Sequence, residues 1–291
     1  MSIQESFPRL GLGTVQFGLP YGISNVLGQV TSDSIATILD RAAQANFSTL
    51  DTAANYGSAE EILGNASALT TPFRIVTKTI GLKSGLDAVL KRARQSVLTL
   101  GSKPVDLLLV HSAGDLAGED GRALWRGLLG LRDEGLYKGI GISAYVADDP
   151  AQLARDFCPD AMQVPFSLLD QRLLRNGALA AVKDQGVEIH ARSLFLQGLL
   201  FMEDGRLPPK LRHAASHLAA VRRYVADAGS TPLAAALAFA LSTPQIDVAL
   251  VGVSSPSELD EIIAAAAPPI PAVDWAACAL DDETVLTPSL W

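Results

Sequence analysis

Val105-Asp106-Leu107-Leu108-Leu109-Val110-His111 is a short, almost continuously apolar run that ends on a titratable side chain. A strand with apolar residues at successive positions is buried on both faces, as in a parallel sheet. Helical segments flank this run. Leu86–Leu100 repeats apolar residues three or four positions apart, and Leu124–Glu134 ends before Gly135, a helix C-cap signal. A strand between two helices is the repeating unit of an α/β fold.

Seven further runs of this kind alternate with helical segments such as Ser32–Ala45 and Leu173–Gln185. They are Leu10–Val15, Phe47–Asp51, Phe73–Thr77, Gly139–Ser143, Ala161–Val164, Val187–Ala191 and Val248–Gly252. Helical crossovers imply parallel pairing. Eight such units predict a closed (β/α)8 TIM barrel, with an open doubly wound sheet as the alternative. We expect one domain over residues 1–291. Its tail, 266–291, should pack on the barrel, because Trp275 and Trp291 would be costly to expose.

Composition excludes several classes of protein. Of the 291 residues 48% are hydrophobic and 19% charged, which is ample for a large core and unlike a disordered chain. The formal net charge of −8 argues against nucleic-acid or anionic-membrane partners, which need a basic surface. Two cysteines cannot build a disulfide framework. The sequence shows no signal-peptide pattern and no apolar run of about 20 residues, so we expect a soluble cytoplasmic protein.

Two short motifs lack the surroundings that their usual functions require. Gly139-Ile140-Gly141-Ile142-Ser143-Ala144 has the spacing of a dinucleotide-binding loop but lies inside a predicted strand, not at a strand-to-helix turn. His213 and His217 are one helical turn apart, as metal-binding histidines can be, but the glutamate of the zinc-peptidase motif is absent. We expect both histidines to lie on a helix surface and to bind no metal.

Polar residues at the ends of predicted strands are more informative. Asp51 ends the second strand, Lys78 follows the third, His111 follows the fourth, and Tyr56 lies five residues after Asp51. The carboxyl ends of barrel strands form the active-site face. An ammonium group favours the phenolate of a nearby tyrosine, so Lys78, held by Asp51, would make Tyr56 a proton donor near neutral pH. These groups cannot store a hydride, so the chemistry requires a redox cofactor.

At these residues the chain resembles the aldo-keto reductase superfamily. The resemblance covers nearly the whole chain and rests on the order of its motifs. They are Leu10–Thr14, Asp51–Gly57 followed by Glu60, Thr77-Lys78, Asp106–His111, Gly139–Ser143 with Gln163, Gln197–Leu200, and Val251-Gly252. It implies a (β/α)8 barrel that reduces aldehydes or ketones to alcohols with NADPH, NADH being possible. The catalytic tetrad it implies is Asp51, Tyr56, Lys78 and His111.

The same resemblance implies the residues that hold the nicotinamide cofactor. Ser143 and Gln163 would contact the carboxamide, and Ser193 and Leu199 lie near the expected phosphate contacts. Arg192 takes the place of a tyrosine that stacks on the nicotinamide in many members, and a guanidinium can also stack. Ala144 replaces an asparagine. At the adenosine end, Gly252, Ser254 and Glu258 carry no positive charge, and Glu258 stands where an arginine is common, so a preference for NADPH should be weak.

The stretches Gly13–Gly18, Tyr21–Asn25, His190–Ser193 and Phe195–Gly198 look like bacterial members associated with sugar metabolism. The substrate pocket expected from them is lined by Phe17, Tyr21, Asn55 and Phe166, since aromatic walls with a few amides suit a hydroxylated carbonyl compound. Two functions compete. The first is an NAD(P)H-dependent reductase of a small-molecule substrate. The second is a cofactor-binding regulatory or accessory protein, for which the departures at Ala144 and Arg192 leave room.

Overall fold

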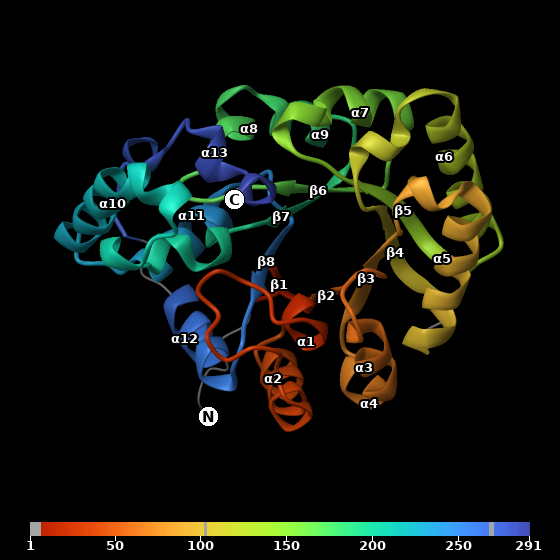
Figure 1. Ribbon diagram of the computed structural model, residues 1–291, viewed down its shortest axis with the longest axis horizontal. Coiled ribbons are helices and arrows are strands. Elements are labelled where there is room, and N and C mark those ends of the chain that lie inside the picture. Colours follow the sequence, from red (N-terminus) through yellow and green to blue (C-terminus); the bar gives the residue numbers. More distant parts are fainter. Residues whose placement is uncertain (1–6, 102–103, 268–270) are drawn as a thin grey trace.

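The computed structural model describes residues 7–101, 104–267 and 271–291. Eight parallel strands form a closed barrel in sequence order, and helices surround it (Figure 1). The strands are β1 Leu10–Gly13, β2 Thr49–Asp51, β3 Arg74–Lys78, β4 Val105–Val110, β5 Tyr137–Ser143, β6 Ala161–Pro165, β7 Glu188–Arg192 and β8 Val248–Gly252. β1 closes the ring: its Leu12 pairs with Leu50 on one side and with Val251 on the other. The predicted (β/α)8 barrel is confirmed, and the open sheet is excluded.

The strands are apolar on both faces because each face packs against something. Two alternate residues of β4, Leu107 and Leu109, belong to a small apolar cluster inside the barrel together with Val76 and Ala161. The other residues join the larger core under the helices. Gly141 makes room inside the barrel, because a Cβ there would lie 2.5 Å from Leu109 Cδ2 and 2.3 Å from the Ala161 carbonyl oxygen. The Gly139–Ser143 motif therefore serves strand packing.

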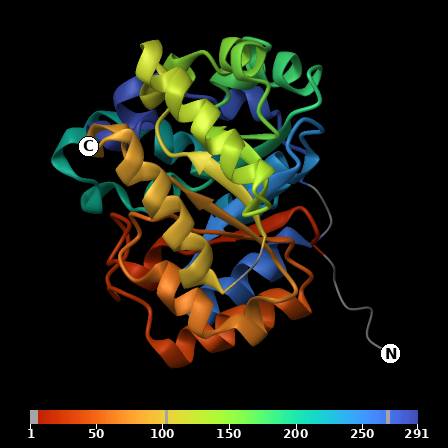
Figure 2. The same ribbon diagram turned by 90° about the vertical axis from the view of Figure 1, so that its right-hand side faces the viewer.

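The crossover helices cover the outside of the barrel. Figure 2 shows two of them, α5 and α6, lying side by side. The helices are α1 Val15–Gly18, α2 Ser32–Gln44, α3 Ala59–Asn65, α4 Ser67–Thr70, α5 Leu86–Leu100, α6 Gly118–Asp133, α7 Pro150–Phe157, α8 Arg172–Arg175, α9 Ala178–Lys183, α10 Ala215–Asp227, α11 Pro232–Ser242, α12 Pro256–Ala266 and α13 Glu283–Leu286. Short 3₁₀ turns join several of them.

The structure corrects some predicted boundaries. The segment Leu173–Gln185 is two helices, α8 and α9, because Gly177 adopts the left-handed conformation with φ of 79° and interrupts the helix. The helix predicted over Leu124–Glu134 begins earlier, at Gly118. The first strand ends at Gly13, and Val15 opens α1. The remaining strand ends agree with prediction to within two residues, because a buried apolar run marks a barrel strand clearly.

The described part of the C-terminal tail lies against the barrel's outer elements. The Trp275 ring packs on Phe239 of α11, with 5.8 Å between ring centroids. The Trp275 carbonyl oxygen accepts a hydrogen bond from Gln171, and the Leu280 amide donates one to the Leu169 carbonyl oxygen. Among the described residues, no single helix has the length and apolarity to cross a membrane. One pair of consecutive helical segments, 209–227 and 232–242, is long and apolar enough only when the two are taken together, and the chain bends by 84° between them.

Candidate active site

The carboxyl ends of β2, β3 and β4 bring three polar side chains together. Asp51 is the last residue of β2, Lys78 is the last residue of β3, and His111 directly follows β4. The Lys78 ammonium donates a hydrogen bond to Asp51 Oδ2 at 2.6 Å, and the side chains of this ion pair are 1% and 7% exposed. A buried ion pair offsets its desolvation only when hydrogen bonds satisfy its remaining atoms. Two such bonds are present: Lys78 donates to the Thr52 carbonyl oxygen at 2.9 Å, and Gln163 donates to Asp51 Oδ1 at 2.6 Å.

Tyr56 completes the group from the loop after β2. Its hydroxyl oxygen lies 3.4 Å from Lys78 Nζ, and Nζ lies 4.9 Å from the centre of its ring. The loop is held close to α1, since a Cβ on Gly18 would lie 1.8 Å from the Tyr56 carbonyl oxygen. Gly57 follows with φ of 56°, within the turn that leads to α3. The backbone, and not only the side chain, therefore fixes the phenol beside the ammonium.

The ionisation of the lysine follows from its surroundings. Burial lowers the pKa of Lys78, but the Asp51 carboxylate and the Tyr56 hydroxyl outweigh burial, so the net shift is upward. Lys78 is therefore a fixed positive charge against the phenol oxygen. In a buried site such a charge stabilises a developing negative charge without reorganisation.

His111 has the opposite behaviour. Burial, and then the positive charge of Lys78, lowers the pKa of His111 to about 4, so the imidazole is neutral at neutral pH. Its ring meets the Tyr56 ring edge-on, at 5.9 Å between centroids and an interplanar angle of 81°. Nδ1 is buried and has no hydrogen-bond partner among the described residues. A neutral imidazole can donate one hydrogen bond to a substrate oxygen, and does so without carrying a charge.

A buried carboxylate, that of Glu60, connects the strand that carries Lys78 with the helices outside the barrel. Glu60 of α3 is 2% exposed and accepts hydrogen bonds from Thr77 at 2.6 Å, Arg92 at 2.6 Å and Ser96 at 3.1 Å. Thr77 precedes Lys78 on β3, and Arg92 also donates to the Ala54 carbonyl oxygen in the loop that carries Tyr56. Sequence reasoning gave Glu60 no role beyond the motif. Its position nine residues after Asp51 was the available signal.

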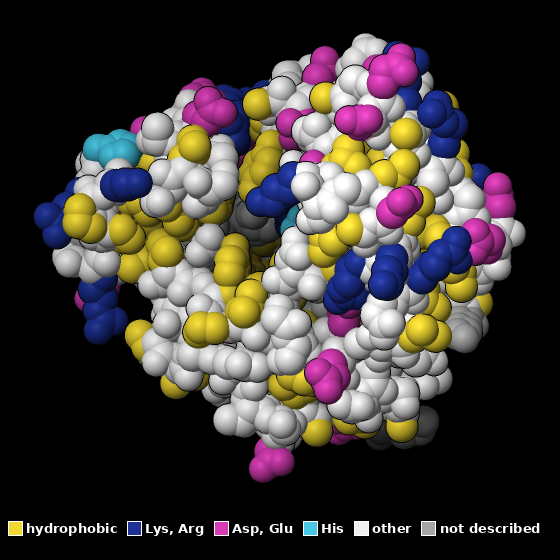
Figure 3. All heavy atoms as spheres, turned by 45° about the vertical axis from the view of Figure 1, so that its right-hand side comes forward, with side chains coloured by type: hydrophobic (Ala, Val, Ile, Leu, Met, Phe, Trp, Pro, Cys, Tyr) yellow, Lys and Arg dark blue, Asp and Glu magenta, His cyan; other side chains and the backbone are white. Residues whose placement is uncertain are grey.

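A cavity of about 950 Å³ opens over these side chains. Figure 3 shows the hollow, with hydrophobic side chains around its mouth and basic side chains at its edge. Of the predicted site residues, those on its wall are Tyr21, Asp51, Tyr56, Lys78, His111, Ser143, Gln163, Arg192, Ser193, Gly252, Ser254 and Glu258. The cavity lies at the carboxyl ends of the strands, the face that holds active sites in (β/α)8 barrels.

Comparison with known proteins fits this arrangement. A model of the Aldo/keto reductase family matches residues 9–280. The chain belongs to the aldo/keto reductase family. The family predicted from the sequence motifs is thereby confirmed, and so is the oxidoreductase class. Members of this family use NAD(P)H and act on small-molecule carbonyl substrates.

Two curated relatives of this chain carry the names of sugar dehydrogenases. The chain is 28% identical to the D-threo-aldose 1-dehydrogenase of a Pseudomonas species, over 93% of each chain. It is also 28% identical to the L-galactose dehydrogenase of Arabidopsis thaliana, over 88% of this chain and 85% of the relative. A solved structure, the holo form of an aldo-keto reductase from Bacillus halodurans, superposes with a TM-score of 0.74 at 18% identity, over 97% and 93% of the two chains. At that identity the likeness shows the fold.

The cavity wall carries groups that suit the nicotinamide end of a cofactor. Ser143 and Gln163 are paired in register on β5 and β6, and both side chains are almost fully buried at the cavity wall. Gln163 donates its amide nitrogen to Asp51, and the same side chain carries an amide oxygen that can accept a hydrogen bond. A hydroxyl group and an amide oxygen together offer a donor and an acceptor, which is what a carboxamide requires.

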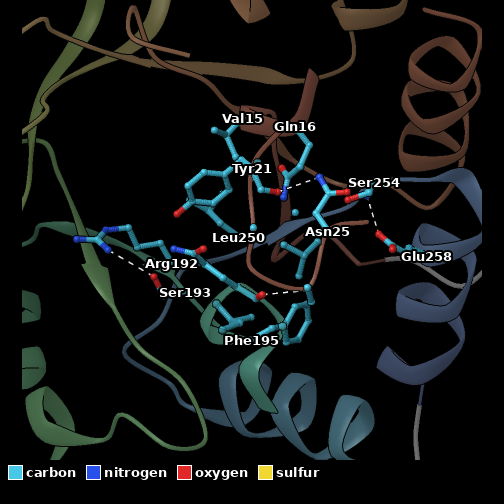
Figure 4. Close-up of a pocket in the computed structure, with 18 of the residues that line it drawn as sticks. Val15, Gln16, Tyr21, Asn25, Arg192, Ser193, Phe195, Leu250, Ser254 and Glu258 are labelled. Atoms are coloured by element: carbon cyan, nitrogen blue, oxygen red, sulfur yellow. Dashed lines mark hydrogen bonds between the residues drawn. The ribbon is translucent and has the colours of Figure 1, made fainter. Parts of the chain in front are cut away.

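The expected adenosine end lies at the start of α12. Ser255 caps this helix by accepting a hydrogen bond from the Glu258 amide at 3.2 Å. The Glu258 carboxylate in turn accepts one from the Ser254 amide at 2.6 Å, drawn in Figure 4. The Glu258 carboxylate therefore occupies the N-terminus of α12, a place that otherwise attracts phosphate. Arg222 of α10 also lines the cavity.

Four predicted residues do not line the cavity. Phe17 and Phe166 are fully buried in the core; α1 turns Phe17 inward, and Phe166 stacks on Phe239 at 4.8 Å. Leu199 is likewise buried in the core. Asn55 lies in the loop before Tyr56 but is exposed to solvent outside the cavity. The aromatic walls come instead from residues that sequence reasoning missed: Tyr145, Phe195 and Phe201.

A segment after β1 crosses the mouth of the cavity. In Figure 4, Tyr21 and Asn25 lie on one side of the cavity, opposite Ser193 and Phe195 of the loop after β7. The two loops meet where Ser24 donates a hydrogen bond to the Gln197 carbonyl oxygen at 3.0 Å. Asn25 braces its own loop by donating to the Tyr21 and Gly28 carbonyl oxygens. The sequence signal for this loop after β1 was a group of polar residues next to a glycine.

The two histidines spaced one helical turn apart, His213 and His217, do not line this cavity. His213 contacts Asp282 at 2.9 Å, and His217 contacts the Cys278 carbonyl oxygen at 3.3 Å. Within the described residues, no group of three or more His, Cys, Asp and Glu side chains is placed to hold a metal ion. Both histidines hold the C-terminal tail against the preceding helices.

Proposed function

We propose that this chain interconverts a small carbonyl compound and the corresponding alcohol, with NADPH or NADH as the redox partner. The observation that carries the proposal is the Tyr56 phenol held 3.4 Å from a buried, charged Lys78. The sugar dehydrogenases among the relatives favour a hydroxylated, sugar-like substrate. A bound nicotinamide cofactor supplies the hydride in reduction and accepts it in oxidation. A cytoplasmic location agrees with the composition.

The residues of the chain supply the proton chemistry. In reduction, the carbonyl oxygen gains negative charge as its carbon gains a hydride, and Tyr56 transfers its hydroxyl proton to that oxygen. Lys78 stabilises the phenolate that remains, and Asp51 keeps the ammonium charged and oriented. The neutral His111 donates a hydrogen bond that fixes the direction of the substrate oxygen. In oxidation the same groups act in reverse, with Tyr56 accepting the proton.

The contacts expected with the cofactor follow from the cavity wall. Ser143 and Gln163 would hold the carboxamide. At the end of β7, Arg192 would lie beside the nicotinamide and Ser193 near the phosphates. Ser254 and Glu258 would face the adenosine ribose. The buried polar pair Ser143–Gln163 supports the first assignment, and the capped start of α12 supports the last.

The test is an activity panel with purified protein. We expect consumption of NADPH or NADH with some of a set of aldehydes, ketones and sugars, and formation of reduced cofactor from the matching alcohols. Binding is measured separately through fluorescence quenching of Trp125, Trp275 and Trp291. Cofactor binding without turnover across the panel would instead support the accessory-protein function. Absence of both would refute the proposal.

A further inference from the structure

Arg192 is an unusual arginine in this molecule. It is the last residue of β7, is half-buried, and lines the cavity. Its guanidinium stacks on the Tyr145 ring with 4.3 Å between Cζ and the ring centroid. Stacking fixes the plane of the group and leaves its edge available for hydrogen bonds. The position therefore combines a rigid cation with free donors inside a ligand cavity.

The guanidinium edge lacks a protein partner of opposite charge. A guanidinium has five N–H donors. Among the described residues, the Arg192 side chain makes one hydrogen bond, a long contact of 3.4 Å to Ser193 Oγ. Across the described residues, no Asp or Glu lies within ion-pair distance of Arg192. Arg92 and Arg172, by contrast, each pair with a carboxylate, Glu60 and Asp170. A cavity-lining guanidinium without a carboxylate partner can bind an anionic ligand without breaking an existing ion pair.

The end of the cavity near the tetrad carries an unbalanced charge, because Arg192 has no carboxylate partner among the described residues. Asp51 is the carboxylate of the tetrad, and it is already paired with Lys78. His111 is neutral, and the Arg192 charge acts on it and on Tyr21. The catalytic end therefore carries one net positive charge in a chain whose formal net charge is −8. A local positive charge would attract an anionic ligand that the rest of the protein repels.

We propose that Arg192 binds an oxyanion on the substrate, a carboxylate or a phosphate, so that the preferred substrates are carbonyl compounds, or their alcohols, that carry such a group. The inference rests on the proposed function and names the substrate class of that site. A carboxylate or phosphate matches the planar, two-pronged edge of a guanidinium. The substrate would then be held at two points: its reacting oxygen at Tyr56 and His111, and its oxyanion at Arg192.

The position of Arg192 favours the substrate over the adenosine end of the cofactor as the source of the anion. In Figure 4, the Arg192 side chain lies at the opposite end of the cavity from Ser254 and Glu258, with Tyr21 between them. Its stacking partner Tyr145 follows β5, two residues after Ser143. The guanidinium thus lies close enough to His111 for its charge to act on the imidazole, which is the end of the cavity where the proposed function places the nicotinamide.

The test compares matched substrates that differ in one charged group. The pairs are 4-carboxybenzaldehyde with benzaldehyde, and glyceraldehyde 3-phosphate with glyceraldehyde. We expect wild type to have a kcat/KM at least tenfold higher for the anionic member, and the ratio to fall to near one in Arg192→Gln. A single hydrogen bond to a charged group accounts for a tenfold effect. Arg192→Lys should keep part of the ratio, because lysine retains the charge without the fork.

Controls separate this proposal from other roles of Arg192. Arg175→Gln removes a surface arginine paired with Asp281, outside the cavity, and should leave the ratio unchanged. Kd for NADPH and NADH is measured for each variant. If Arg192→Gln weakens cofactor binding while the substrate ratio persists, Arg192 serves the cofactor and the proposal is wrong. A wild-type ratio near one for both pairs also overturns it. The pair that shows the effect identifies the anion as carboxylate or phosphate.

Binding experiments keep the inference testable if no compound is turned over. That result would count against the proposed function. Calorimetry with the oxidised cofactor present would then compare benzoate with benzamide, and inorganic phosphate with no addition. At least tenfold tighter binding of benzoate than of benzamide, or measurable phosphate binding, that is lost in Arg192→Gln would support an oxyanion site. Equal affinities in wild type and Arg192→Gln would overturn it.

Discussion

The Lys78 ammonium lies 3.4 Å from the Tyr56 hydroxyl oxygen and 2.6 Å from Asp51 Oδ2, so the phenol and the carboxylate share one buried cation. Asp51 is the permanent counter-charge. The Tyr56 oxygen becomes a second one only when it loses its proton. In the proposed mechanism this arrangement would stabilise the charge that proton transfer creates, which is the form of stabilisation that lowers a reaction barrier.

Removal of the Tyr56 hydroxyl tests the proton donor directly. We expect Tyr56→Phe to lower kcat by roughly 10²–10⁴-fold, because the transition state loses its proton donor while the ring keeps its packing against His111. Cofactor affinity, measured by fluorescence quenching, should stay near wild type. Tyr224→Phe, which removes a phenol hydroxyl on α10, is the matched control. Turnover by Tyr56→Phe within a few-fold of wild type would refute the assignment.

Lys78 is tested together with its ion-pair partner Asp51, because removal of Lys78 alone should affect both stability and activity. Lys78→Met leaves the Asp51 carboxylate buried without its cation, which should cost about 3–5 kcal/mol of stability as well as activity. The double variant Lys78→Met/Asp51→Asn removes both charges and should recover much of the stability while activity stays low. Thermal unfolding and kcat are measured for both. Recovery of activity together with stability would show that Lys78 is structural only.

The polar ends of strands made half of this site predictable. Asp51, Lys78 and His111 interrupt apolar runs at the carboxyl ends of consecutive strands, and barrel geometry brings such positions together whatever the loops do. Tyr56 could be placed because its loop is short. The helices α8 and α9 were predicted as one, since a single glycine within an apolar pattern does not reveal its φ in advance.

The walls of the cavity were harder to predict, and the reason is physical. A large apolar side chain near a strand end satisfies the same sequence pattern whether it lines a cavity or fills the core. Phe17 and Phe166 were assigned to the pocket, yet both are buried. The stacking of Arg192 on Tyr145 joins the ends of β5 and β7 across β6. Such a contact depends on side-chain directions that strand periodicity does not specify.

Acid should weaken the opposite end of the barrel. Hydrogen bonds from His190 and Arg74 outweigh burial and lower the pKa of Glu188 from 4.5 to about 2. A depressed pKa in the folded state contributes stability above the unfolded value, and that contribution is lost as pH falls from about 4.5 to about 2. The full shift would correspond to about 3.4 kcal/mol, and solvent screening of the partly exposed Arg74–Glu188 pair reduces the expected contribution to roughly 2 kcal/mol. Urea unfolding of wild type and Glu188→Gln across this pH range measures it.

Glu188→Gln should be less stable than wild type at pH 6 and should lose less stability on acidification. The two stability curves are therefore expected to converge near pH 2. Parallel curves would show that Glu188 does not carry this pH dependence. Lys138→Gln, which removes a surface pair with Asp106 at the same end of the barrel, serves as the comparison for an exposed ion pair.

The choice of cofactor should depend on Glu258. Its carboxylate accepts a hydrogen bond from the Ser254 amide at 2.6 Å and so places negative charge at the N-terminus of α12. A 2′-phosphate brought to this place would meet a like charge and would compete for the same amide. A ribose diol carries no charge and can donate to the carboxylate. We therefore expect wild type to bind both cofactors, with a weaker preference for NADPH than in family members that carry basic residues here.

Glu258→Arg should shift the ratio of the dissociation constants of NADH and NADPH toward NADPH by roughly tenfold, equivalent to about 1.4 kcal/mol. Glu258→Gln removes the charge but adds no cation, so its shift should be smaller and in the same direction. Glu119→Arg makes the same charge change at the start of α6 and controls for the net charge of the protein. Fluorescence quenching with each cofactor gives the four ratios. An unchanged ratio in Glu258→Arg would mean that the start of α12 does not contact the ribose, and the assignment of the adenosine end would be wrong.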